Sequence, residues 1–140
     1  MAALGHSVYV AWTDDTTGNM DVLFRASHDG GGSFGDTMNL SESGGQSFIP
    51  LMVAFEDTVY VAWFEVSGPC NNLLRISHDG GEEFGEPICL DDFGISGAIK
   101  IAAVSDEKFY VIGFGQIEGV SDVLLLRSND WGENFRKSGH

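Results

Sequence analysis

The chain contains the segment Ser27-His28-Asp29-Gly30-Gly31-Gly32-Ser33-Phe34, and two similar segments follow it. The second copy reads Ser77-His78-Asp79-Gly80-Gly81-Glu82-Glu83-Phe84, and the third reads Ser128-Asn129-Asp130-Trp131-Gly132-Glu133-Asn134-Phe135. We call these three segments the boxes. Their first serines are 50 and 51 positions apart, and a fixed period of this length is typical of repeat architectures.

β-prone runs recur at the same period as the boxes. The runs before the boxes are Val8–Trp12 with Asp21–Ala26, Val59–Trp63 with Asn72–Ile76, and Phe109–Phe114 with Asp122–Arg127. The runs after the first two boxes are Thr37–Leu40, Ile49–Ala54, Pro87–Leu90 and Ile99–Val104. Segments rich in Gly, Ser, Asp and Asn separate them, so each unit predicts four short strands. We expect one partial domain over residues 1–140, with repeats at about 1–47, 48–97 and 98–140.

The run Val59-Tyr60-Val61-Ala62-Trp63 is apolar on both faces, whereas a half-exposed strand would alternate apolar with polar residues. Such a strand must be covered on both sides. Repeated four-stranded antiparallel sheets packed face to face are the blades of a β-propeller. The sequence therefore predicts an all-β fold with about three blades.

Each position that the boxes share has a physical task in a tight turn. The Asp carboxylate accepts hydrogen bonds from backbone N–H groups, and the Ser hydroxyl does so more weakly. The Gly allows a positive φ, and the Phe anchors the turn between sheets. These structural residues are Ser27, Asp29, Gly31, Phe34, Ser77, Asp79, Gly81, Phe84, Ser128, Asp130, Gly132 and Phe135.

The pattern resembles the Asp box, or BNR repeat, of sialidase-like β-propellers, whose consensus is Ser/Thr-x-Asp-x-Gly-x-Thr/Ser-Trp/Phe. Glu83 and Asn134 depart from it at the seventh position, and Trp131 stands beside the Gly of the third box. The resemblance implies that the boxes are structural and lie away from the central site. The alternative is that their regularly spaced carboxylates recruit a partner or a cation.

The resemblance also implies what an enzyme of the family would need, namely three arginines around a substrate carboxylate, a tyrosine nucleophile with a glutamate, and an aspartate. Arg25, Arg75 and Arg127 each stand directly before a box or two residues before it, so the repeat explains them, and Arg136 is the fourth arginine. The three tyrosines occupy equivalent places in apolar strands and are expected in the core: Tyr9, Tyr60 and Tyr110. We therefore predict no catalytic residues.

A grafted function would use residues that interrupt the repeat. These are His6, Asp14–Asp15, Glu65–Cys70, Asp91–Asp92 and Gln116–Gly119. Carboxylates in this set could help hold Ca²⁺, but the spacing of a calcium loop is absent, and we expect solvated turn acids, no metal site and no cofactor. His28 and His78 are expected as exposed turn residues.

Cys70 and Cys89 flank the second box. Folding the hairpin around that box brings them close together, which leaves a disulfide or two reduced thiols as alternatives. A disulfide would favour a secreted or cell-surface location, and nothing else in the sequence indicates a location.

The charge balance excludes some partners. With 7 Lys+Arg against 21 Asp+Glu, the net charge is -14, which repels nucleic acid and acidic membranes. The apolar runs are also too short to cross a bilayer. We expect neither nucleic-acid binding nor membrane insertion.

Three blades cannot close a ring. The alignment of repeats predicts that the chain begins within a first strand and stops at 135–140, where the fourth strand of the third unit should begin. The resemblance implies a six-bladed ring, so we expect a homodimer, or else a piece of a longer propeller. The expected function is a non-catalytic scaffold or recognition module whose ring face binds a glycan or protein. The alternatives are a sialidase-like glycoside hydrolase and a structural or engineered fragment.

Overall fold

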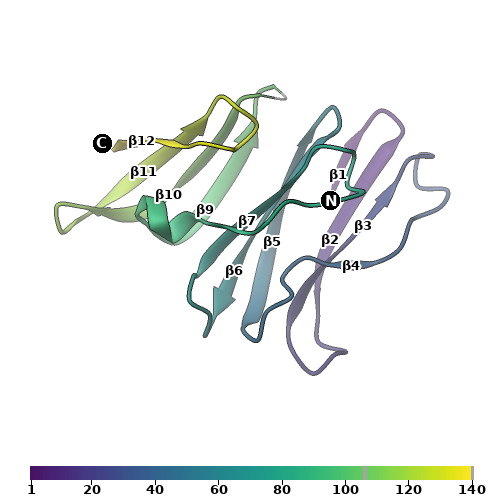
Figure 1. The fold of residues 1–140 in the computed structure, drawn as a ribbon, viewed down its shortest axis with the longest axis horizontal. Helices are drawn as coiled ribbons and strands as arrows, with labels where there is room; N and C mark the ends of the chain where they lie inside the picture. The colour runs from purple at the N-terminus through teal and green to yellow at the C-terminus, as the bar shows by residue number, and fades with distance from the viewer. Residues whose placement is uncertain (106, 140) are drawn as a thin grey trace.

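Three four-stranded antiparallel sheets make up the computed structural model, which describes residues 1–105 and 107–139 (Figure 1). The first sheet contains β1 (Ala2–Leu4), β2 (Ser7–Asp14), β3 (Asp21–Ser27) and β4 (Met38–Asn39). The second contains β5 (Gln46–Phe55), β6 (Thr58–Val66), β7 (Asn72–Ser77) and β8 (Ile88–Cys89). A 3₁₀ turn, η1 (Leu90–Phe93), leads to the third, which contains β9 (Ile95–Ala103), β10 (Phe109–Ile117), β11 (Val120–Ser128) and β12 (Arg136–Gly139).

The second and third strands pair in a closely similar register in all three sheets. Within each sheet, neighbouring strands along the chain are neighbours in space. Each tyrosine of the repeat pairs with the residue that precedes a box serine, as Tyr9 with Ala26, Tyr60 with Ile76 and Tyr110 with Arg127. The all-β fold and the four-stranded repeat unit are therefore confirmed.

The strands give the repeat units finer bounds than the sequence did. The third sheet does have its fourth strand, because β12 pairs with β11 through Arg136, Lys137, Ser138 and Gly139, while the predicted end at His140 lies outside the described residues. The second sheet begins at Gln46 and the third at Ile95, a few residues before the expected repeat boundaries. The early start of β5 spans an irregularity between Phe48 and Leu51, which the sequence did not indicate.

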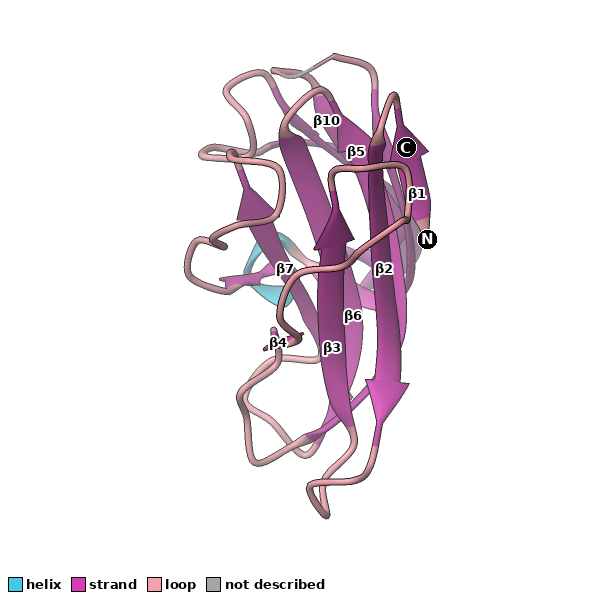
Figure 2. Ribbon diagram, turned by 90° about the vertical axis from the view of Figure 1, so that its right-hand side faces the viewer, coloured by secondary structure: helices cyan, strands magenta, loops and turns pink. Residues whose placement is uncertain are grey.

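The sheets stack side by side in chain order, so the second sheet lies between the other two (Figures 1 and 2). We call the space between the first and second sheets the first seam, and that between the second and third sheets the second seam. Tyr9, Phe24, Val59, Val61 and Trp63 belong to the buried cluster of the first seam. The second seam has its own buried cluster, which includes Tyr60, Leu74, Phe109, Val111 and Leu126.

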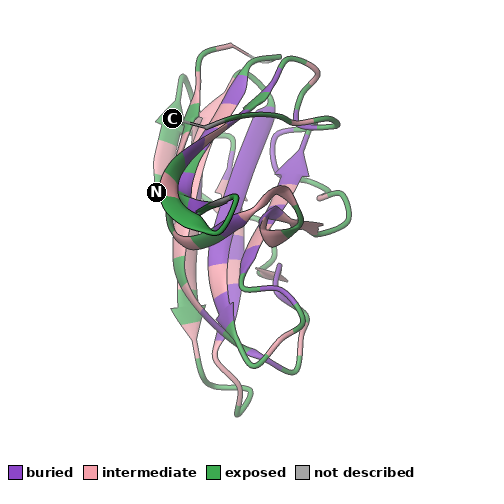
Figure 3. Cartoon of the chain, turned by 90° about the vertical axis from the view of Figure 1, so that its left-hand side faces the viewer, coloured by how far each residue is buried: buried purple, intermediate pink, exposed green. Residues whose placement is uncertain are grey.

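Burial differs between the middle and outer sheets (Figure 3). In β6 every residue from Thr58 to Trp63 is buried, because sheets cover both of its faces. In β10 burial alternates, and Ile112 and Phe114 are 44% and 59% exposed. Of the three sheets, only the second therefore has a neighbouring sheet packed against each of its two apolar faces. Within the described residues, no helix has the length and apolar character needed to span a membrane.

Candidate functional site

The three boxes form nearly the same hydrogen-bonded turn. The serine hydroxyl donates to the Asp carboxylate at 2.8 Å in Ser27–Asp29, and at 2.7 Å in Ser77–Asp79 and in Ser128–Asp130. It also accepts the N–H of the box glycine at 2.8 to 2.9 Å. These serines are buried. The polar atoms of the motif are thus used within the turn, as its structural interpretation requires.

The seventh position of each box decides how well its carboxylate is satisfied. The Ser33 hydroxyl donates to Asp29 Oδ2 at 2.6 Å, and Asn134 Nδ2 donates to Asp130 Oδ2 at 2.8 Å. The hydrogen bonds from Ser33 lower the pKa of Asp29, and those from Asn134 and Ser128 lower the pKa of Asp130. At Glu83 only the backbone N–H donates to Asp79, at 3.0 Å.

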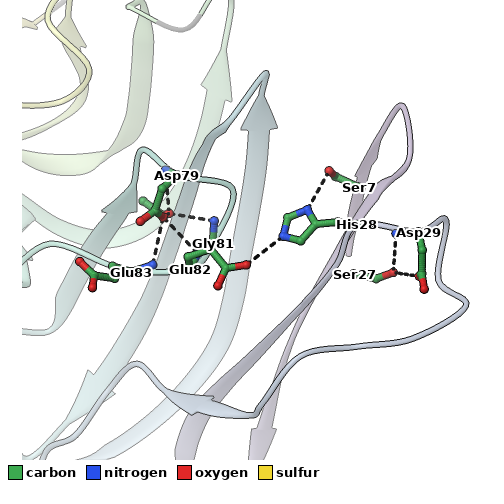
Figure 4. Close-up of polar contacts among 9 residues, drawn as sticks. Ser7, Ser27, His28, Asp29, Asp79, Gly81, Glu82 and Glu83 are labelled. Carbon is green, nitrogen blue, oxygen red and sulfur yellow. Dashed lines mark hydrogen bonds and ion pairs between the residues drawn. The ribbon is translucent and has the colours of Figure 1, made fainter.

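The box glycines of the second and third sheets pack on the preceding sheet. A Cβ on Gly81 would lie 2.7 Å from Phe24 Cζ, and one on Gly132 would meet Ile76 and Tyr60. Gly31, in the first box, faces open space. His28 bridges the first seam, since its Nδ1 contacts Ser7 Oγ and its Nε2 contacts Glu82 Oε1, each at 3.2 Å (Figure 4).

Of the four arginines only Arg127 and Arg136 lie together, as partners across β11 and β12 that line one hollow. Arg25 Nε donates to the Gly35 carbonyl and Arg75 Nε donates to the Gly85 carbonyl, both at 2.8 Å, so these two side chains brace their own boxes. Arg127 is exposed and stands one position later relative to its box, on the opposite face of its strand. No cluster of three arginines, as a substrate carboxylate would require, is found in the described part of the chain.

Two of the three tyrosines are fully buried and one is not. Tyr9 and Tyr60 have no exposed surface, and Tyr60 stacks on Phe109 with ring centroids 4.0 Å apart. Tyr110 is only partly buried, so its expected place in the core was wrong; it lies on the uncovered face of the third sheet. The burial of Tyr9 and Tyr60 keeps them from a substrate.

Cys70 and Cys89 form a disulfide, with Cα atoms 5.9 Å apart. Cys89 lies opposite Leu73 in the β7–β8 pair, and Cys70 lies in the turn before β7. The bond therefore fastens the outer edge of the second sheet to the turn that precedes β7.

Most residues that interrupt the repeat gather at one end of the sheets. The boxes lie at the other end, where Gly30 and Gly80 donate to the carbonyls of His6 and Asp57 in the first hairpin turn of each sheet, both at 2.7 Å. Asp14–Asp15, Glu65–Cys70, Asp91–Asp92 and Gln116–Gly119 all belong to turns or strand ends at the opposite end. We call it the loop end.

A buried polar network holds the loop end of the first seam together. Glu65, 2% exposed, accepts hydrogen bonds from Ser43 Oγ at 2.8 Å and Ser47 Oγ at 3.3 Å. The buried Asp21 accepts from Thr17 Oγ1 at 2.9 Å and Ser41 Oγ at 3.2 Å. Both carboxylates face neutral donors from the connection between β4 and β5, from the start of β5 and from the β2–β3 turn, so they anchor these segments.

Two of the four turn acids considered for calcium, Asp14 and Asp91, accept hydrogen bonds from protein donors. Asp14 accepts hydrogen bonds from the hydroxyl and N–H of Thr16, which lower its pKa. Asp91 accepts the N–H groups of Asn71 and Asn72 at 2.8 and 3.0 Å. Among the described residues, the one group of three metal-capable side chains is Cys70, Cys89 and Asp91, and its two sulfurs are already bonded to each other.

Sequence reasoning missed a groove at the box end of the second seam. Trp131 lines two adjoining hollows there, both of which also include His78 and Glu133. The signal in the sequence was a tryptophan at a position where the other two boxes have Gly30 and Gly80. That the side chain lines a groove between two sheets follows only from their packing.

Comparison with models of known protein families and with curated proteins gives no match for this sequence.

Proposed function

We propose that the chain is a non-catalytic β-propeller module that assembles with a second copy into a closed ring, and that the loop end of this ring binds a glycan or protein. One observation carries the proposal: both outer sheet faces are equivalents of faces that are buried at the seams. The repeat aligns Val8 with Val59 and Phe109, and it aligns Tyr110 with Tyr9 and Tyr60.

The seams supply the template for this assembly. At the second seam Tyr60 of one sheet stacks on Phe109 of the next. On the outer faces, Tyr110 and Val8 are only partly buried and have no sheet opposite them within the described chain. Joining the third sheet of one copy to the first sheet of another would set Tyr110 over Val8 of the partner subunit, in the same relation. Two such contacts, related by a twofold axis, close a ring.

Burial of apolar surface supplies the driving force. The outer face of the third sheet exposes Ile112 and Phe114, and contiguous exposed apolar patches mark interaction surfaces. The recognition surface is proposed at the loop end because the repeat-breaking residues gather there. A hydrolase is disfavoured because Arg25 and Arg75 are bound to box carbonyls.

Light scattering coupled to size exclusion tests the assembly. The expected mass is twice the chain mass of 15.1 kDa. Phe114→Asp, which puts a charge on the outer face, should give a monomer, whereas the matched change Val120→Asp, at the β10–β11 hairpin turn and 69% exposed, should leave the dimer intact. A wild-type monomer at micromolar concentration would contradict self-assembly and favour additional blades from a longer chain.

A glycan array probed with the wild-type dimer tests recognition. Retention of a defined glycan that is lost when loop-end residues are changed supports the proposal, and no retention of any glycan or purified protein partner argues against it. Turnover of a fluorogenic sialoside would instead favour the hydrolase.

A further inference from the structure

The groove at the box end of the second seam is built from one aromatic ring and many acids. Trp131 is 39% exposed and lines adjoining hollows of about 430 and 390 Å³. One hollow has an apolar floor that includes Ile76, Phe84 and Ile88, and the other lies toward the β5–β6 turn. We call the two together the Trp131 groove. It does not depend on ring closure, because all of its residues come from the second and third sheets.

Apart from His78, which lines both hollows, the ionisable side chains of the Trp131 groove are all acidic. Its lining contains six carboxylates and neither lysine nor arginine. These acids are Glu56, Asp57, Asp79, Glu83, Glu86 and Glu133. Asp79 is used in its own box turn, whereas Glu56, Asp57 and Glu133 are exposed around the ring of Trp131. A cation entering the groove would meet favourable charge on several sides.

The box turn does not require a tryptophan at position 131. Gly30 and Gly80 occupy the same place with φ of 71°, and Trp131 adopts φ of 57°, a region that bulky residues rarely enter. Its N–H still donates to the Glu107 carbonyl at 3.2 Å, as the glycines donate to their own hairpin turns. The large ring therefore stands in a conformation suited to glycine and adds an exposed aromatic surface to a turn that closes without it.

We propose that the Trp131 groove binds an arginine side chain of a peptide or protein partner. The guanidinium would stack on the Trp131 ring, and its N–H groups would donate to exposed carboxylates of the groove such as Glu133 and Glu56. Arginine combines both interactions because it is planar, weakly hydrated and always charged. Its aliphatic stem would cover the apolar floor.

An uncharged sugar fits this lining less well. A sugar could also stack on Trp131, but its hydroxyls would leave six carboxylates without a counter-charge, and partial desolvation of unpaired charges is costly. Acidic sugars would be repelled. The charge of the groove thus selects a cationic ligand.

An NMR titration with a capped five-residue peptide, Gly-Gly-Arg-Gly-Gly, tests the proposal. The chain has three tryptophans, so the indole N–H signal of Trp131 can be followed separately from those of Trp12 and Trp63. We expect a saturable shift of the Trp131 signal. The same peptide with citrulline, which keeps the shape of arginine without its charge, should bind at least about tenfold more weakly.

Variants separate binding from folding. Trp131→Gly restores the residue found in the other two boxes, so it should fold normally and still lose most of the affinity for the arginine peptide. Glu133→Gln should weaken binding severalfold, whereas Glu82→Gln, the same change at the equivalent position of the second box, should not. The proposal is overturned if the arginine peptide shows no saturable binding at millimolar concentration, if citrulline binds equally well, if Trp131→Gly binds as the wild type does, or if a neutral oligosaccharide binds Trp131 more tightly.

Discussion

Asp29 has a carboxylate whose oxygens are used to close a turn, and this use has a thermodynamic consequence. Its hydrogen bonds from Ser33 and Ser27 favour the ionised form, so its pKa is lowered in the folded chain. In Asp79 burial acts in the opposite sense, but the N–H groups and the Ser77 hydroxyl outweigh it and the pKa is also lowered. The boxes thus link the turns to the protonation of three acids.

The stability contributed by Asp29 should disappear in acid. Because its folded pKa lies below its unfolded value of about 3.9, the contribution is complete above that value and is lost as the pH falls through the folded pKa. Asp29→Asn lacks this linkage. Urea unfolding of both proteins between about pH 6 and pH 2 should show the wild type more stable at neutral pH and the difference shrinking below about pH 4. A difference that is constant with pH would contradict the linkage.

The turn that each box forms could be predicted from its residue types, but the residues that pack around the box could not. Ser, Asp and Gly at fixed spacing imply the turn, because its hydrogen bonds are local. The sequence shows Trp131 as a departure from the box pattern. It does not show the groove, because His78 and Glu56, which also line it, belong to the neighbouring sheet. The buried Glu65 was visible only as a break in the repeat, since its partners are distant in sequence: Ser43 lies in the connection before β5 and Ser47 lies in β5.

A comparison of Gly31 with Gly81 distinguishes the cost of backbone strain from the cost of a clash between sheets. Gly31 and Gly81 have φ of 88° and 84°, but only Gly81 is packed against the neighbouring sheet. Alanine at either place should cost about 1–2 kcal/mol of backbone strain. Gly81→Ala should cost about 1–3 kcal/mol more, because its Cβ would overlap the ring of Phe24. Chemical denaturation of both variants measures the difference, and equal losses would show that the seam accommodates the methyl group.

The disulfide should stabilise the second sheet by restricting the unfolded chain. Cys70 and Cys89 are 19 residues apart, and a loop of this length corresponds to about 3 kcal/mol in the chain-entropy description. The double variant Cys70→Ser, Cys89→Ser should lose about this much in urea unfolding. Reductant should destabilise the wild type similarly and leave the variant unchanged. A wild type insensitive to reductant and as stable as the variant would contradict this role.

Strands that bury apolar side chains could be predicted from the sequence, whereas a strand held mainly by backbone hydrogen bonds could not. The β-branched and aromatic runs identify β2, β6 and β10, because these strands bury their side chains. β12 consists of Arg136, Lys137, Ser138 and Gly139 and offers no apolar pattern, so its pairing with β11 could not be read from composition. The edge strands β4 and β8 were predicted from the runs Thr37–Leu40 and Pro87–Leu90, because each has an apolar residue, Met38 or Ile88, that packs on a buried cluster.

At the scale of the whole molecule, the described residues form two filled seams and leave two different outer faces uncovered, each equivalent to a face that is buried at a seam. The second sheet shows what a covered sheet is like, since six consecutive residues of β6 are buried. The first and third sheets have similar strands, but each has a neighbouring sheet on one face only. The two proposals therefore rest on different forces, burial of apolar surface on the outer faces and electrostatic attraction in the Trp131 groove.

Salt should affect these two modes in opposite directions. Each copy carries a net charge of -14, so copies repel one another, and raising NaCl from about 20 to about 500 mM shortens the screening length from about 20 Å to about 4 Å. Self-association should therefore strengthen with salt, as repulsion is screened while burial of Phe114 and Ile112 is not. Binding of the arginine peptide should weaken over the same range, because attraction to the rim carboxylates is screened. Analytical ultracentrifugation and peptide titration in the same buffers measure both trends, and an arginine affinity independent of salt would exclude the charged rim as its cause.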